Sequence, residues 1–293
     1  MARAPKVLWT FHGTAAVRSY HAAVEWLGRF VGCVALEWSD APPPVARLGG
    51  CCWMADGMLE IAQPNAPNTP TAGFIERYGP GFLNLALQLD DLRNADAWLT
   101  GKGAKPSLPP EQGFTFTRPS ETCGLQFEWA ALERGDWDPH FGAKIPPRPT
   151  PLIDAPRFAH WGGMVAEPSA AVARLKELCD WPLLFERYEA PASQPAAAFS
   201  LGDGVMTLYR VPASPEEAAR LWGTPVARPR FHHMAFRVRD LAQAAKVFAD
   251  QRVRILRGSV ADGEIVTHPE DTQGLCIVWT DREIDGDPRG PLR

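Results

Sequence analysis

Hydrophobic and polar residues alternate along several short segments of this chain and predict a regular order of strands and helices. Residues 7–17 alternate with a period of two, as a half-buried strand does. Residues 19–30 place apolar side chains at helical spacing, with Ser19 as the candidate N-cap. Three strands are then expected at residues 33–38, 45–54 and 58–63, the last two joined as a hairpin around Asp56-Gly57. The predicted unit is therefore one strand, one helix and three more strands.

The same unit is expected three more times. Its first strands are predicted at residues 82–89, 157–166 and 230–238, and helical segments follow at 92–100, 170–179 and 241–251. In the second unit the three closing strands are placed near Lys105, at 114–116 and at 124–129. A capping box of Ser214 and Glu217 predicts a short extra helix in the third unit. The pattern indicates an α+β chain of four βαβββ modules.

Parts of the sequence also repeat at a nearly constant offset. Residues 119–129, PSETCGLQFEW, return as residues 269–279, PEDTQGLCIVW, in the common form P-x-(acid)-T-x-G-L-x-x-x-W. Residues 82–92, FLNLALQLDDL, return as residues 231–241, FHHMAFRVRDL. Such self-similarity indicates two copies of one domain. We therefore place the first domain at 1–135, a Pro-rich linker with six prolines at 136–156 and the second domain at 157–285. The polar tail after Asp281 is expected to be loose.

Composition narrows the class of protein. The net charge of −4 and the lack of a Lys/Arg run argue against a nucleic-acid surface. There is no run of 18 or more apolar residues and no signal-peptide pattern at the start, so the sequence predicts no membrane span and a cytoplasmic location. The six cysteines form no C-x-x-C pair, which argues against a thiolate zinc site.

Four polar side chains fall on the strand face that turns away from the helices of the first half. They are His12, Glu60, Asn84 and Glu128. Imidazole and carboxylate groups are ligands for Zn, Fe, Mn, Ni or Co. A bare pair of carboxylates inside a concave sheet also costs free energy unless it is paired or bound to a metal. The alternative is that this is simply the solvated face of an antiparallel sheet.

The modules and their motifs resemble the vicinal oxygen chelate superfamily, which includes glyoxalase I, methylmalonyl-CoA epimerase, extradiol dioxygenases and bleomycin resistance proteins. HGTAAVRSY, MLEIAQP, FIERYGPGFLNLALQLDDL and TCGLQFEW are similar to its motifs. The resemblance implies two glyoxalase-like domains with cupped mixed sheets. It also implies a divalent metal at His12, Glu60 and Glu128, with Asn84 as a weaker ligand where the family usually has histidine.

The second half departs further from the family pattern. His160 and His233 match the two histidine positions, the second position is Thr207 or Leu208, and Val278 replaces the glutamate. Two histidines without a carboxylate make a poor metal site, so we expect this half to be metal-free. Alternation places His232 on the opposite face from His233.

The eleven tryptophans offer either large cores or an aromatic-lined pocket. Alternation puts Trp9, Trp129 and Trp161 on the helix-facing side of their strands, and Phe11 on the same side as Trp9.

The resemblance implies a metal-dependent enzyme that stabilises an enolate-like anion of a small oxygenated substrate, as an isomerase, epimerase or lyase. Glu60 or Glu128 is the candidate base, and Glu60 at the second position favours this branch over oxygen insertion. One alternative is an extradiol-type ring-cleaving dioxygenase. The other is a metal-free small-molecule binding protein of the resistance type. The expected partner is a small-molecule substrate, and the chain is expected to be a monomer or a homodimer.

Overall fold

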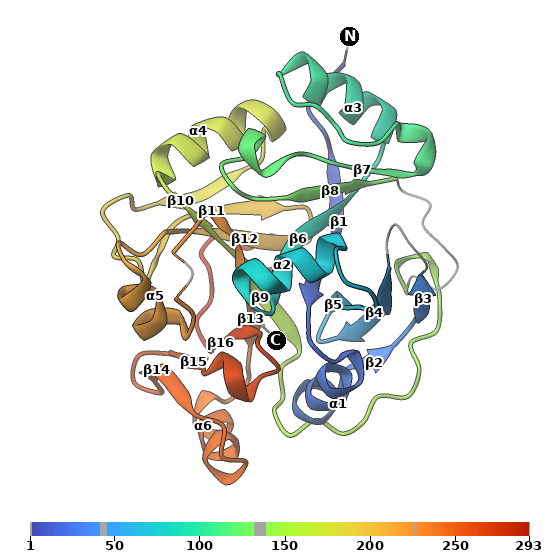
Figure 1. Ribbon diagram of the computed structural model, residues 1–293. Helices are drawn as coiled ribbons and strands as arrows, with labels where there is room; N and C mark the ends of the chain where they lie inside the picture. Colours follow the sequence, from blue (N-terminus) through green and yellow to red (C-terminus); the bar gives the residue numbers. More distant parts are fainter. Residues whose placement is uncertain (1, 42–45, 132–138, 226, 293) are drawn as a thin grey trace.

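The computed structural model describes residues 2–41, 46–131, 139–225 and 227–292, which form two eight-stranded mixed sheets and six α-helices. The first sheet has the order β2-β4-β5-β1-β6-β8-β7, with β3 paired to β4, and the second has the order β10-β11-β12-β9-β13-β16-β15-β14. The sheets lie next to each other, the first blue to green and the second yellow to red (Figure 1). The first-half strands are β1 (Val7–Ala16), β2 (Val34–Ala35), β3 (Ser39–Ala41), β4 (Arg47–Met54), β5 (Gly57–Pro64), β6 (Gly81–Leu89), β7 (Phe114–Phe116) and β8 (Phe127–Ala130).

The second-half strands follow the same plan. They are β9 (Arg157–Val165), β10 (Leu183–Glu186), β11 (Pro195–Leu201), β12 (Gly204–Arg210), β13 (Arg230–Arg237), β14 (Ile255–Ser259), β15 (Glu264–Thr267) and β16 (Cys276–Thr280). The helices are α1 (Tyr20–Val31), α2 (Pro70–Tyr78), α3 (Leu92–Gly101), α4 (Pro168–Cys179), α5 (Pro215–Trp222) and α6 (Leu241–Asp250). Within the described residues, no helix is both long enough and apolar enough to cross a membrane.

Four modules are present that each open with a strand and a helix and continue with further strands, so the predicted α+β fold class is confirmed. Within each half, the first strands of the two modules pair antiparallel, β1 with β6 and β9 with β13. The predicted caps are also formed, since the Ser19 and Ser214 side chains accept from the amides of Ala22 and Glu217. One predicted strand is wrong, because no strand forms around Lys105 and β7 alone precedes β8 in the second module.

The repeated motif has the same structure in both halves, which explains its constant positions. Pro119 and Pro269 each open a short 3-10 turn. Gly124 and Gly274 follow at φ of 96° and 85°, a backbone conformation that glycine adopts without strain. The tryptophans at the end of the motif are buried, and Trp129 and Trp279 donate from Nε1 to threonine hydroxyls at 3.3 and 3.2 Å. The positions that the two copies share therefore have a role in folding, whereas Glu128 lies at a position where the copies differ.

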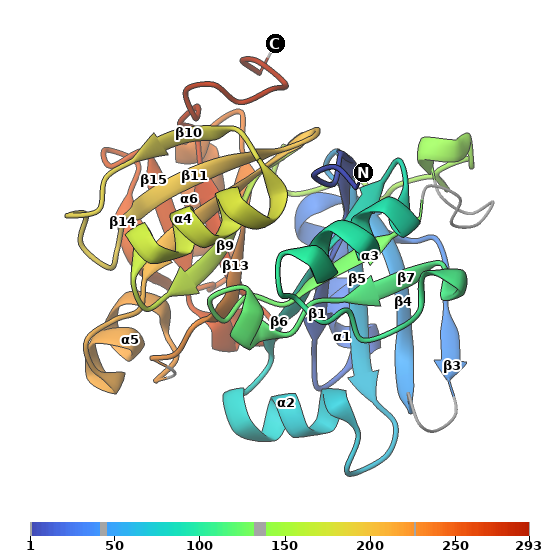
Figure 2. The ribbon, with the colours of Figure 1, turned by 90° about the horizontal axis from the view of Figure 1, so that it is seen from above.

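One core joins the two halves. The apolar faces of β6 and β8 meet those of β9 and β13, and Phe127 packs edge-on against Phe231 with ring centroids 5.3 Å apart. Gly13 has no side chain where the Trp161 ring approaches, since a Cβ there would lie 2.3 Å from the ring. Helices α3 and α4 lie side by side over this junction (Figures 1 and 2), where Trp98 Nε1 donates to Leu178 O at 2.7 Å. The opposite face of each sheet, which we call the cup face, does not take part in this shared core.

Two residues of β1 lie on the cup face and not on the helix-facing side that alternation predicted. The β1–β6 ladder shifts register between Val7 and Trp9 and again between Thr10 and His12. As a result Trp9 lies opposite Gln88 and stacks on His140 at 4.7 Å, and Phe11 joins the apolar cluster of the cup face. Each extra residue in a bulge reverses the faces that follow it.

A bulge also changes the sheet face on which His232 lies. The β13–β9 ladder shifts between Phe231 and His233, and the His232 ring lies 5.0 Å from Trp222 and 5.6 Å from His233. The expectation that His232 faces away from His233 is therefore wrong. Trp129 and Trp161, in contrast, belong to the shared core as alternation predicted.

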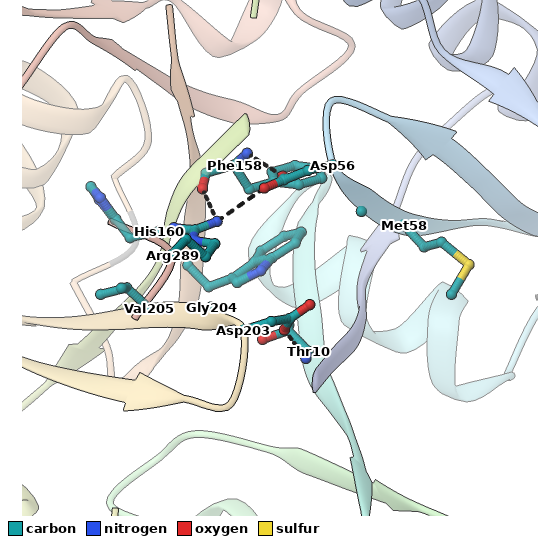
Figure 3. A pocket seen from close by; sticks show the side chains of 11 residues that line it. Thr10, Asp56, Met58, Phe158, His160, Asp203, Gly204, Val205 and Arg289 are labelled. Carbon is teal, nitrogen blue, oxygen red and sulfur yellow. Dashed lines mark hydrogen bonds and ion pairs between the residues drawn. The ribbon is translucent and has the colours of Figure 1, made fainter. Parts of the chain in front are cut away.

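The tail, expected to be loose, ties the two halves together (Figure 3). Arg289 Nη1 donates to Phe158 O at 2.7 Å and lies 3.3 Å from Asp56 Oδ2, at the tip of the β4–β5 hairpin. A second contact between the halves does not involve the tail: Asp203, at the tip of the β11–β12 hairpin, accepts from the Thr10 amide at 2.8 Å. The expectation of a loose tail is wrong because the partly buried guanidinium of Arg289 anchors it.

The predicted linker begins outside the described residues, at 136–138. Its described part lies on the first half, where Arg148 donates to the carbonyls of Gly32 and Val31 at 2.9 and 3.0 Å.

Candidate functional site

The cup face of the first sheet holds two rows of polar side chains at its centre. Strand register places Thr14 opposite Glu60 on one side and Asn84 on the other. In the next row His12 lies opposite Ala86, which pairs with Glu128. His12, Glu60, Asn84 and Glu128 are only 4–8% exposed. The structure therefore brings the four predicted side chains onto one buried surface, which we call the first cup.

Glu60 is the most constrained carboxylate of this cup. Its Oε2 accepts from the Thr14 hydroxyl at 2.8 Å, and its Oε1 forms an ion pair with Arg47 of β4. The Thr14 oxygen also lies 3.3 Å from His12 Nδ1. Because the single hydroxyl proton of Thr14 goes to Glu60, this contact is made with His12 Nδ1–H as the donor. Arg47, Glu60, Thr14 and His12 thus form one chain of contacts.

Charge compensation keeps Glu60 ionised. Burial alone would raise its pKa, but Arg47, His12 and the Thr14 hydroxyl together hold the pKa of Glu60 below its usual range. In the reverse direction, burial would lower the pKa of Arg47, but the negative charges of Glu60 and Glu128 raise it. The first cup is therefore a cluster of opposite charges in which buried carboxylates surround the partly buried Arg47.

Asn84 and Glu128 form the other part of the cup. Asn84 Nδ2 donates to Glu128 Oε2 at 3.4 Å, a long hydrogen bond. The Glu128 charge also acts on Arg47, so the two parts of the cup share one cation.

The donor set of the first cup has the right chemistry for a divalent metal but not the right arrangement. Both oxygens of Glu60 are engaged, one by Arg47 and one by Thr14. Within the part of the chain that the structure describes, no three His, Cys, Asp or Glu side chains are grouped so that they could hold a metal ion. As they lie, the residues do not fit the metal that the resemblance implies, and Arg47 supplies the positive charge.

Register identifies the matching positions of the second half. Gly162 lies opposite Thr207 and His233, as Thr14 lies opposite Glu60 and Asn84. Ala235 pairs with Val278, as Ala86 pairs with Glu128. The second position is therefore Thr207 and not Leu208. At the places of the two glutamates this half carries a hydroxyl and an apolar group.

The second cup, built around His160 and His233, is neutral at its centre. The two Nε2 atoms are 3.3 Å apart, and the Tyr209 hydroxyl lies 3.5 Å from His160 Nε2. Burial lowers the pKa of His160 to about 3 and holds the pKa of His233 well below its usual range. His233 stacks on Trp222 with centroids 4.9 Å apart. Gly162 makes room for His233, because a Cβ there would lie 2.0 Å from its ring.

Sequence reasoning missed three side chains of these cups: Arg47, Tyr209 and Arg257. Arg47 and Tyr209 had a signal, since each alternates onto the cup face of a strand that was predicted. Arg257 lies on β14, opposite Val266, which itself pairs with Val278. The sequence analysis gave no bounds for β14, so it did not predict the face on which Arg257 lies.

This architecture, two tandem pairs of βαβββ modules with polar cups, is the fold of the two-domain vicinal oxygen chelate proteins. The chain is similar to a triple mutant of 4-hydroxymandelate synthase from Streptomyces coelicolor, with 17% identity, a TM-score of 0.67 and coverage of 96% of this chain and 95% of that one. It is also similar to a xylose isomerase-like TIM barrel/4-hydroxyphenylpyruvate dioxygenase fusion protein, with 15% identity and a TM-score of 0.60. That match covers 99% of this chain and 51% of the fusion protein, so the chain spans about half of it.

Methylmalonyl-CoA epimerase from Mycobacterium tuberculosis matches one half, with 18% identity, a TM-score of 0.41 and coverage of 46% of this chain and 94% of that one. No family model matches the chain. No curated protein matches it either. At these identities the similarity establishes the fold, and the chemistry has to be argued from the cups themselves.

Proposed function

We propose that the first cup is a reaction site that moves a proton on a small oxygenated substrate, in an isomerase, epimerase or lyase type of reaction. The observation that carries this proposal is a group of four ionisable side chains on one sheet face, of which Glu60, His12 and Glu128 are buried and Arg47 is partly exposed. Burying charges costs free energy, and such clusters are concentrated at functional sites. A merely solvated face would leave these side chains exposed.

The arrangement suggests a role for each group. Arg47 is the cation that stabilises negative charge on a substrate carbonyl oxygen. Glu60 positions Arg47 and is a weak base, because two partners hold it and its pKa is lowered. Glu128 is then the candidate base. It takes a proton from the carbon next to the carbonyl, the C–H electron pair moves into an enolate-like anion facing Arg47, and return of the proton completes an isomerisation.

An assay that does not require the natural substrate to be known tests this role. The protein is incubated in D₂O with a panel of small 2-oxo acids, 2-hydroxy acids and acyl thioesters, and loss of the C–H signal is followed by NMR. We expect exchange with at least one class, and a fall of about 100-fold or more in Glu128→Gln, the range for loss of a general base. Glu111→Gln is the matched control, because the Glu111 side chain is 56% exposed. No exchange with any compound, or equal rates in the two variants, would contradict the proposal.

The competing form of this proposal uses a divalent metal, Zn, Fe, Mn, Ni or Co, at His12, Glu60 and Glu128, with Asn84 as a weaker ligand. A metal there requires that Arg47 leave Glu60. Elemental analysis of untagged protein distinguishes the two forms. The metal form predicts about one metal ion per chain and tighter metal binding in Arg47→Met, which removes the competing cation. The arginine form predicts no stoichiometric metal in either protein.

A ring-cleaving dioxygenase is less well supported. The usual iron site of non-heme oxygenases needs two histidines and one carboxylate. The second cup has His160 and His233, but Thr207 and Val278 stand at the two carboxylate positions. Oxygen uptake with catechols tests this alternative. The shared core supports a chain that can act as a monomer, because the two domains pack together within one chain.

A further inference from the structure

The second cup contains a cavity of about 630 Å³, within the size range of ligand pockets. It opens between β10, β11, β12 and β14 and the segment that follows β16. One part of its wall is apolar and another part is polar. The apolar side chains include Leu184, Phe185 and Leu221, and the polar ones include His160, Thr207 and Arg257.

Arg257 reaches this cavity with part of its guanidinium unused. Its Nε donates to Leu221 O at 3.1 Å and its Nη1 donates to Glu264 at 2.8 Å. The guanidinium carbon lies 4.4 Å from the centroid of the Trp222 ring. Nη2 is buried and has no hydrogen-bond partner among the described residues. A buried charged donor without an acceptor is costly, so an acceptor from outside the chain that reached Nη2 would stabilise the site.

His160 carries the second unused group. Its Nε2 contacts His233 and Tyr209, but its Nδ1 is buried without a partner among the described residues. The ring is neutral, so Nδ1 is either a donor or an acceptor according to the tautomer. Two unmet polar atoms thus belong to side chains that line one cavity.

The charges around the cavity limit the ligand. Three arginines and four acids line it: Arg187, Arg257, Arg282, Asp262, Glu264, Glu283 and Asp285. This balance disfavours a multiply charged anion such as phosphate. A single negative charge can still bind Arg257, because charge-assisted hydrogen bonds are the strong ones. The apolar wall requires that the rest of the ligand be apolar.

We propose that the second cup is a metal-free binding site for a small organic acid, with its carboxylate at Arg257 and its apolar body against Leu184, Phe185 and Leu221. Val278 and Thr207, in place of the two glutamates of the first cup, remove the negative charges that would repel a carboxylate. The two cups are thereby suited to different ligands. This inference does not depend on the reaction proposed for the first cup.

Isothermal titration calorimetry with phenylacetate, 3-phenylpropionate and hexanoate, and with their primary amides, tests the site. We expect at least one acid to bind at millimolar concentration or below, and its amide to bind about tenfold more weakly or worse. Arg257→Met keeps an apolar group over Trp222 and should weaken acid binding by about tenfold to a hundredfold. Arg254→Met is the matched control, since Arg254 lies three residues away and pairs with Glu270 and Asp271 on the surface.

Thr207→Val, which conserves shape and removes the hydroxyl, provides a second variant should Arg257→Met fail to fold, and weaker acid binding is again expected. Deuterium exchange at the first cup should be unchanged in both. The proposal is overturned if no acid binds at millimolar concentration, if acids and amides bind equally, if phosphate binds better than the acids, or if a folded Arg257→Met binds acids as Arg254→Met does.

Discussion

Replacing Arg47 by methionine should expose how strongly the first cup depends on its internal cation. The Arg47 side chain is 30% exposed and that of Glu60 is 11% exposed, so the pair is neither fully buried nor on the open surface. Two unit charges about 4 Å apart attract by about 4 kcal/mol at an effective dielectric constant of about 20, before desolvation is subtracted. Exposed pairs contribute about 0–1 kcal/mol, and removing one partner of a buried pair costs about 3–5 kcal/mol. We expect Arg47→Met to lower the free energy of unfolding by about 2–3 kcal/mol at pH 7.5, a value between these limits.

The loss should depend on pH with a defined sign. In the native protein the pKa of Glu60 is lowered, so its contribution is complete above its unfolded pKa of about 4.3 and disappears as the pH falls through the folded value. Without Arg47, burial is the largest remaining influence and raises the pKa of Glu60. Protonation of Glu60 then stabilises the folded variant. The difference in free energy of unfolding between Arg47→Met and the native protein should therefore shrink as the pH falls from 7.5 to 5.

Urea unfolding of the native protein, Arg47→Met, Glu60→Gln and the double variant measures this at both pH values. The double variant should be more stable than Arg47→Met, because it no longer buries an uncompensated carboxylate. A deficit of less than about 0.5 kcal/mol at pH 7.5, the range of ordinary surface substitutions, would refute the reasoning. A deficit that is equal with and without Glu60 would refute it as well.

Other predictions concern the second cup and the thiols. Gly162→Ala should cost about 1–3 kcal/mol in urea unfolding, because its Cβ would lie 2.0 Å from the His233 ring. Gly73→Ala in helix α2 meets no atom within 4 Å and should instead stabilise by up to about 1 kcal/mol; a similar loss in both would contradict the steric argument. Cys123 is half-buried while the other five cysteines are buried, so it should be the first to react with a thiol reagent. Because burial raises the pKa of Cys123, that reaction should accelerate as the pH rises above 8, and prompt labelling of several thiols in native protein would count against this.

The alternation of polar and apolar residues predicted the faces of β5 and β8, and of β6 from Asn84 to Gln88, because the ladders keep their register over these residues. The same rule failed at Trp9, Phe11 and His232, where bulges insert a residue. A bulge depends on how two distant strands fit together, so a single strand's pattern does not contain it.

Long side chains set a second limit. The pattern places Arg47 on a face, but its partner Glu60 is not its neighbour in the ladder, since Arg47 pairs with Pro64 and reaches along the strand. In the same way Arg289 crosses from the tail to Asp56. Sequence patterning predicts which side of a sheet a residue faces, whereas the end point of a long side chain depends on tertiary packing.

Ala86 pairs with Glu128 in one half, whereas Ala235 pairs with Val278 in the other. This difference bears on how the two cups can change in evolution. Had the two domains been separate copies of one short chain, symmetry would have forced each substitution to occur twice. Joined in one polypeptide, each copy can mutate alone, so a change that abolishes one cup leaves the other intact. The covalent connection therefore allows the two cups to diverge in sequence behind a single shared core.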